Sequence, residues 1–165
     1  MNKKIIGLFL LICLVALFGC TQVPIANNEF SKLEGSICTD DGKPIIRMYS
    51  TTTCPHCLWV KATFDSVAKE YMDANKIVAY HWEWDYNPQT GTATGDNTLT
   101  SINEGEVPTL EENIFNQFSP KGYVPAFVVG CRYYRIGNKF EQQGDLNAER
   151  VEFVKIFDQI VADSK

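Results

Sequence analysis

Apolar and polar residues follow one another along residues 36–165 in patterns that predict a helix between two strands. Residues 45–49 form an apolar run typical of a buried strand. Residues 76–85 are rich in β-branched and aromatic side chains and predict a second strand. A strand–helix–strand unit favours parallel pairing of its strands. The helix is predicted within residues 58–75, where apolar side chains recur at helical spacing: Val60, Phe64, Val67, Ala68 and Tyr71.

The segment that follows combines a polar stretch with a second predicted helix. Residues 87–105 are dominated by Thr, Asn, Gly and Asp and predict a long surface loop. Thr109 and Glu112 have the spacing of a capping box, which predicts a helix over Leu110–Phe118, and Pro120 follows its end.

The last part of the chain predicts a hairpin and a terminal helix. Two apolar runs, residues 124–130 and 132–136, flank Gly130 and Cys131 as a hairpin does. Asp145 is placed to begin the terminal helix. No internal repeat separates these elements, so we expect a single α/β domain over residues 36–165. The apolar face of the terminal helix is predicted to hold Leu146, Val151, Val154, Phe157 and Val161.

The N-terminus has the pattern of an export signal. Two lysines precede an uncharged apolar run, Ile5–Phe18, which is shorter than the roughly 20 residues that cross a bilayer as a helix. Residues 1–19 are therefore predicted to be a signal peptide and residues 20–35 a polar tether. Leu17 to Cys20 resembles the lipobox of prokaryotic lipoproteins, which implies lipidation of Cys20; ordinary signal cleavage and an uncleaved anchor are the alternatives. All three place the domain outside the cytoplasm. A lipid on Cys20 or an uncleaved anchor would also tether it to the membrane, in the periplasm or on the outer face of the cytoplasmic membrane.

Charge and cysteine content further limit the classes of function that the chain can have. The 165 residues carry a net charge of -5 and no cluster of Lys and Arg, so we expect no nucleic-acid partner. Apart from Cys13 in the signal and Cys20, four cysteines remain for the domain. In an oxidising compartment an even number of cysteines is consistent with two pairs. The four cysteines of the domain are Cys38, Cys54, Cys57 and Cys131.

The chemistry is concentrated in the sequence Cys54-Pro55-His56-Cys57, where the first predicted strand gives way to the helix. Cysteines at i and i+3 on a first helical turn can close a small disulfide. The helix N-terminus and the His56 imidazole favour the thiolate form of Cys54, and Cys57, one turn further in, is expected to be the shielded resolving thiol. A stable thiolate makes the corresponding disulfide a good oxidant.

Other uses of the motif are less consistent with the sequence. A purely structural disulfide would use the same two cysteines but would constrain little chain. A haem attachment site needs His directly after the second cysteine, where this chain has Leu58. A zinc site needs about four ligands, and no second CxxC or His pair is present. We therefore expect neither a metal nor a cofactor.

Residues 44–163 resemble the thioredoxin superfamily, and most closely its DsbA-like oxidases. The resemblance rests on the strand before CPHC, the second strand, the Val124-Pro125 step into an apolar hairpin and the final helix. It implies a thioredoxin-like α/β fold, with a central mixed sheet flanked by helices, and thiol:disulfide oxidoreductase activity. It also implies a cis proline that faces the cysteine pair. Pro125 is assigned this role, with Val124 contacting substrate, because the acidic helix-capping sequence after Pro108 is not that of a central strand.

Two features depart from the family pattern. The family often has an acidic residue six positions before the first cysteine, where this chain has Met48, so proton transfer is expected to use water or another group. The connection from Trp84 to Pro125 is too short for the helical insertion of a full DsbA oxidase. The oxidising direction therefore rests on Pro55 and His56. A reductase or isomerase remains an alternative, as does a tethered, non-enzymatic binding domain that uses the 87–105 loop for recognition.

The other two cysteines of the domain are predicted to form a structural disulfide. A strand after Pro125 that is antiparallel to the strand before Cys54 brings Cys131 back to the pole where Cys38 lies; two unrelated thiols are the alternative. The expected partners are exported proteins with thiols or disulfides and a membrane redox protein. His81 and the aromatic residues of the predicted strands are expected to pack in the core rather than act in catalysis.

Overall fold

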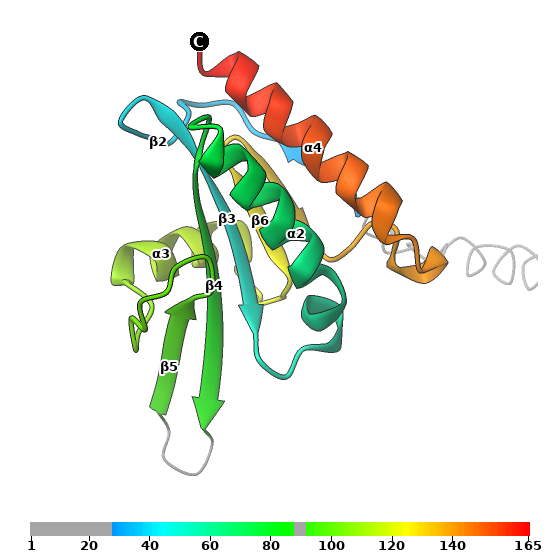
Figure 1. The fold of residues 1–165 in the computed structure, drawn as a ribbon. Helices are drawn as coiled ribbons and strands as arrows, with labels where there is room; N and C mark the ends of the chain where they lie inside the picture. The colour runs from blue at the N-terminus through cyan, green and yellow to red at the C-terminus, as the bar shows by residue number, and fades with distance from the viewer. Residues whose placement is uncertain (1–27, 88–91) are drawn as a thin grey trace, which may run out of the picture.

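The computed structural model describes residues 28–87 and 92–165, which fold around one mixed sheet of seven strands (Figure 1). The strand order is β1-β7-β6-β3-β4-β5, and β2 pairs with β3 beside this path. The strands are β1 (Ser31–Lys32), β2 (Thr39–Asp40), β3 (Lys43–Thr51), β4 (Val78–Asn87), β5 (Thr92–Asn97), β6 (Ala126–Val129) and β7 (Tyr133–Ile136). The described helices are α2 (Pro55–Asp73), α3 (Thr109–Phe118), the short 3₁₀ turn η1 (Glu141–Gln143) and α4 (Leu146–Asp163).

The centre of the sheet is the predicted strand–helix–strand unit. β3 and β4 run parallel, with Ser50 opposite Glu83, and α2 connects them. β6 pairs with the other side of β3 in the antiparallel sense, and β6 and β7 form the predicted hairpin. The α/β class and the mixed sheet are thus confirmed.

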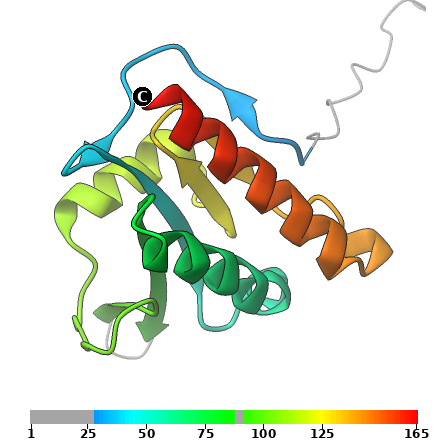
Figure 2. The ribbon, with the colours of Figure 1, turned by 45° about the horizontal axis from the view of Figure 1, so that its top comes forward.

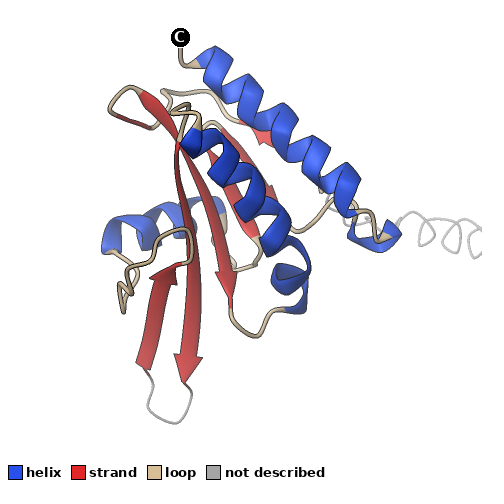
Figure 3. Ribbon diagram, viewed as in Figure 1, coloured by secondary structure: helices blue, strands red, loops and turns tan. Residues whose placement is uncertain are grey.

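Helices cover both faces of this sheet (Figures 2 and 3). On one face, α2 and α4 lie side by side and pack Phe64 and Phe157 into the larger apolar core. On the other face, α3 packs Phe118 against a smaller core that contains Tyr49 and Trp82. His81 is fully buried, as expected. The start of α2, where CPHC lies, is therefore anchored between the end of β3 and the larger core.

The predicted loop over residues 87–105 is wrong in part, because Thr92–Asn97 forms strand β5. This strand pairs antiparallel with β4 at the edge of the sheet. The Asn97 side chain supports it by accepting a hydrogen bond from the His81 backbone N–H at 2.9 Å. A Cβ at Gly95 would lie 2.2 Å from Val107, so a larger residue would not fit there. In this chain, part of the polar, Thr-containing segment that predicted a loop is therefore an edge strand.

The predicted capping box is also wrong. Pro108 is the N-cap of α3, no side chain caps this helix, and Thr109 is its first residue. Glu111, in the first turn of α3, points into the protein and makes buried polar contacts there. Its carboxylate accepts hydrogen bonds from Arg47 Nε at 2.7 Å and from the Tyr49 hydroxyl at 2.8 Å. The first turn of α3 is thus held by contacts of Glu111 with Arg47 and Tyr49 on β3, and not by a side-chain cap.

The terminal helix begins as predicted, but its buried face differs from the prediction. The Asp145 side chain accepts a hydrogen bond from the Ala148 N–H at 2.9 Å and caps α4. Leu146 and Val151, which were expected to be buried, are 40% and 66% exposed. The face that packs on the sheet contains Phe153, Phe157 and Ile160, all fully buried. Phe157 is thus confirmed as part of the buried face, and Val154 and Val161 pack against the edge of the same core, whereas Leu146 and Val151 do not belong to it.

The pole of the sheet opposite CPHC is closed by the predicted Cys38–Cys131 disulfide. The two cysteines are 93 positions apart in sequence, and closing a loop of this length contributes roughly 4–5 kcal/mol in the chain-entropy model. β1 pairs with β7 at the sheet edge, so the ordered domain includes Ser31–Lys32 from the segment predicted to be a tether. The predicted signal peptide and Cys20 lie outside the described residues.

Candidate active site at the start of helix α2

Cys54 occupies the N-cap of α2, and Pro55 is the first helical residue. Proline suits this position because its missing N–H would have no partner inside the helix. The Cys54 sulfur accepts a hydrogen bond from the Cys57 backbone N–H at 3.2 Å. No acidic side chain lies in the first turn of α2. The helix therefore presents an N–H donor and the positive end of its dipole to this sulfur.

The two cysteines of the motif differ in exposure. Both are free thiols; Cys54 is half-buried, whereas the Cys57 side chain is fully buried. Burial raises the pKa of the Cys57 thiol far above its ordinary value, the hydrogen bond to Cys54 raises it further, and a backbone hydrogen bond from Thr51 opposes the rise. The site thus combines one accessible sulfur with one shielded, protonated thiol.

This difference predicts selective alkylation of the reduced protein. At neutral pH, iodoacetamide is expected to modify Cys54 more than about tenfold faster than Cys57, because a thiol whose pKa is raised by more than a unit has over tenfold less thiolate. Peptide mass spectrometry over a time course measures both rates. In denaturant the two rates should converge; equal rates in the folded protein would contradict the assignment of Cys57 as the shielded thiol.

The loop before β6 brings Val124 and Pro125 to the cysteine pair. The Val124–Pro125 peptide bond is cis, and the Cys54 thiol donates to the Val124 carbonyl at a sulfur–oxygen distance of 3.8 Å. Pro108, the rejected alternative, caps α3 instead. The structure therefore places the Val124 carbonyl against Cys54, and Val124 and Pro125 line a cavity of about 380 Å³ together with His56.

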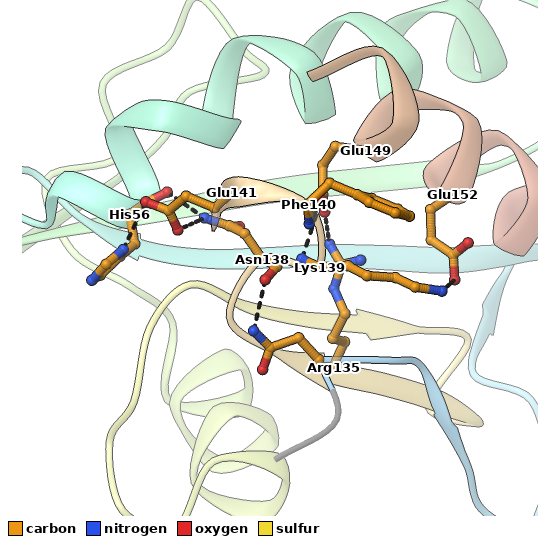
Figure 4. Close-up of polar contacts among 9 residues, drawn as sticks. His56, Arg135, Asn138, Lys139, Phe140, Glu141, Glu149 and Glu152 are labelled. Atoms are coloured by element: carbon orange, nitrogen blue, oxygen red, sulfur yellow. Dashed lines mark hydrogen bonds and ion pairs between the residues drawn. The ribbon is translucent and has the colours of Figure 1, made fainter. Parts of the chain in front are cut away.

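Two residues that the sequence analysis missed hold His56 in this cavity (Figure 4). Glu141 accepts a hydrogen bond from His56 Nδ1 at 2.8 Å through one carboxylate oxygen and one from the Asn138 side chain at 2.8 Å through the other. The same Asn138 amide also donates to the His56 backbone carbonyl at 2.8 Å. Glu141 and Asn138 are more than 80 positions from His56, so no local sequence signal indicates the contact.

A second polar cluster, beneath α2, has the composition of a catalytic triad but not its accessibility. His81 Nε2 lies 2.8 Å from the Ser50 hydroxyl, and His81 Nδ1 lies 2.7 Å from Asp65. Ser50 and His81 are both fully buried. No substrate can reach this serine, so the cluster satisfies polar groups in the core.

Over residues 28–87 and 92–165, no three His, Cys, Asp or Glu side chains are grouped closely enough to hold a metal ion. Within the same ranges, no helix has both the length and the apolar character that a membrane span requires. Comparisons of the chain with protein-family models, with curated proteins and with solved structures gave no match. The site must therefore be interpreted from its own geometry.

Proposed function

We propose that this chain is a thiol:disulfide oxidoreductase of thioredoxin-like fold that forms disulfides in exported proteins. The observation that carries the proposal is the environment of the Cys54 sulfur. It lies at a helix N-terminus, accepts the Cys57 N–H, and contacts the carbonyl of Val124 beside a cavity. A half-exposed nucleophilic sulfur with a buried partner three residues away is the arrangement that thiol–disulfide exchange requires.

The topology and the second cysteine pair support the rest of the proposal. Parallel β3 and β4 joined by α2, the antiparallel β6–β7 hairpin and the closing helix α4 are consistent with a thioredoxin-like domain. The Cys38–Cys131 disulfide is consistent with an oxidising compartment outside the cytoplasm. Membrane attachment through a lipid on Cys20 or an uncleaved anchor belongs to the same proposal and rests on the sequence.

The proposed reaction begins with the Cys54–Cys57 disulfide. A substrate thiolate attacks the Cys54 sulfur, the bond between the two cysteines breaks, and Cys57 leaves and takes up a proton. The substrate's second thiolate then attacks its own sulfur in the mixed disulfide and releases Cys54 as a thiolate. Two electrons pass from the substrate dithiol to the CPHC pair, and a membrane redox partner accepts them in turn.

The oxidising direction rests on Pro55 and His56 in the sequence, and the surroundings of Cys54 support it. The Cys57 N–H and the N-terminal end of α2 both face the sulfur that the substrate dithiol would reduce, as expected of a pair that accepts electrons. No specific contact favours a reductase or isomerase. The binding-domain alternative used residues 87–105 as a recognition loop, part of which is strand β5 paired with β4.

The reduction potential of the CPHC pair tests the proposal. The full chain is equilibrated with glutathione redox buffers and also mixed, in its oxidised form, with a reduced test protein that has two thiols. We expect a potential between about -200 and -120 mV and net oxidation of the test protein. A potential below about -250 mV would indicate a reductase, and the absence of any exchange would contradict an enzymatic role.

A further inference from the structure

The Cys57 thiol has no direct contact with bulk water with which to exchange its proton. The Cys57 side chain is fully buried. Met48, two positions before Ser50 on the same strand, is buried and apolar and offers no proton acceptor. Thiol exchange nevertheless requires Cys57 to gain a proton when it leaves and to lose one when it attacks. A second group must therefore serve this sulfur.

Glu83 on β4 is placed to be that group. It lies opposite Ser50 in the parallel β3–β4 ladder, one residue from Thr51. Lys61 follows Cys57 by one turn of α2, on the same side of the helix, and its Nζ lies 3.4 Å from Glu83 Oε2. Burial is the main cause of the raised pKa of the Cys57 thiol, and the negative charge of Glu83 adds a smaller contribution in the same direction.

Glu83 also has a route to solvent. Its side chain is 15% exposed and lines an open surface cavity of about 270 Å³ together with Thr52 and Asp85. Water in such a cavity can carry a proton between the carboxylate and the exterior. Glu83 thus has access to solvent, which the Cys57 thiol lacks.

Several charged or titratable groups surround Glu83. Lys61 faces it from α2, Asp96 is its register partner on β5, Asp85 lines the same cavity, and Glu104 is bonded through its N–H to Asp96. His81, two positions earlier on β4, has hydrogen-bond partners on both ring nitrogens, Ser50 on one and Asp65 and Thr98 on the other. His81 is therefore committed to these contacts, whereas no hydrogen bond to Glu83 Oε1 is present within the described part of the chain.

We propose that Glu83 transfers the proton of Cys57 during exchange. The inference rests on the proposed function of the CPHC pair. When the Cys57 thiol attacks Cys54 in a mixed disulfide, its proton passes to the Glu83 carboxylate, directly or through one water. The Cys54–Cys57 bond forms, and the substrate leaves as a thiolate. In the oxidising direction the same proton returns from Glu83 to Cys57 as the bond between the two cysteines breaks.

The reaction of the reduced full chain with dithio-bis-nitrobenzoate isolates this step. Attack by Cys54 releases one coloured thiolate, and resolution by Cys57 releases a second. Cys57→Ser leaves only the first phase of the CPHC pair and so identifies the second. Glu83→Gln is expected to slow the second phase about a hundredfold at neutral pH, leave the first phase unchanged, and make the second phase proportional to hydroxide concentration.

Two variants make the result specific. Asp85→Asn removes a carboxylate from the same cavity and is expected to leave both phases unchanged. Lys61→Met keeps Glu83 but removes its cationic neighbour, and should move the pH midpoint of the second phase upward even if Glu83→Gln does not fold. An unchanged second phase in the glutamine variant, or an unchanged midpoint in the methionine variant, would overturn the inference alone. A wild-type chain without a second phase would overturn the proposed function as well.

Discussion

Replacing Cys54 with serine is expected to lower the rate at which the oxidised chain oxidises a reduced test protein by roughly a thousandfold or more. The variant cannot form the Cys54–Cys57 disulfide, and the sulfur that remains, Cys57, is fully buried and cannot reach a substrate. In the proposed reaction, the substrate attacks the accessible sulfur at the N-cap of α2. The measurement is the loss of free thiols from the test protein over time.

Cys57→Ser is the matched control, because it removes the other sulfur and leaves the accessible one. It also abolishes net oxidation, but its Cys54 should form mixed disulfides that are not resolved, visible as covalent adducts on a non-reducing gel. Cys54→Ser should give no such adducts. Undiminished oxidation by Cys54→Ser would instead support the binding-domain alternative, in which the motif is structural.

The parts of the molecule that the sequence predicted well are those determined by neighbours along the chain. An apolar run followed by CPHC and a helical pattern places Cys54 at a helix start, because strand, turn and helix are continuous. The Cys38–Cys131 pairing follows from the sense of two strands: once the strand after Pro125 is antiparallel to β3, Cys131 returns to the pole of Cys38. Such inferences need only strand direction and length.

The parts that could not be predicted depend on contacts between distant segments. The capping box was assigned to Thr109 and Glu112, whereas the residue of this turn with buried partners is Glu111, which pairs with Arg47 on β3. Glu141 and Asn138 reach His56 only because η1 and the loop before it fold back over α2. Glu83 becomes a candidate only when the register with Ser50 is known. None of these residues belongs to a short motif.

The His56 contacts depend in turn on a buried ion pair in the next segment of chain. Glu149 on α4 accepts hydrogen bonds from the backbone N–H groups of Lys139 and Phe140 at 3.1 and 3.0 Å, and it forms an ion pair with Arg135 on β7 (Figure 4). One carboxylate therefore anchors both β7 and the loop that carries Asn138 and Glu141. A substitution of Glu149 should therefore disturb the candidate active site although both of its cysteines are unchanged.

Replacing Glu149 with leucine is expected to lower the free energy of unfolding by about 3–5 kcal/mol. Both members of the Arg135–Glu149 pair are fully buried, so the variant leaves a guanidinium without a counter-charge and two backbone N–H groups without an acceptor. Burial already lowers the pKa of Arg135, and Glu149 is the group that opposes this. Urea denaturation measured by circular dichroism gives the change in free energy.

Two comparisons distinguish the cost of leaving Arg135 without its buried partner from the cost of removing a negative charge in general. Arg135 lies within 5.0 Å of the ring centroids of Phe30, Phe127 and Phe153, so Arg135→Met fills the same apolar site, and Arg135→Met combined with Glu149→Leu should regain much of the lost stability. Glu70→Gln breaks the solvent-exposed pair with Arg150 and should cost less than about 1 kcal/mol. A loss of this small size for Glu149→Leu would mean that the aromatic rings alone stabilise the buried Arg135 and would contradict the role given to the carboxylate of α4.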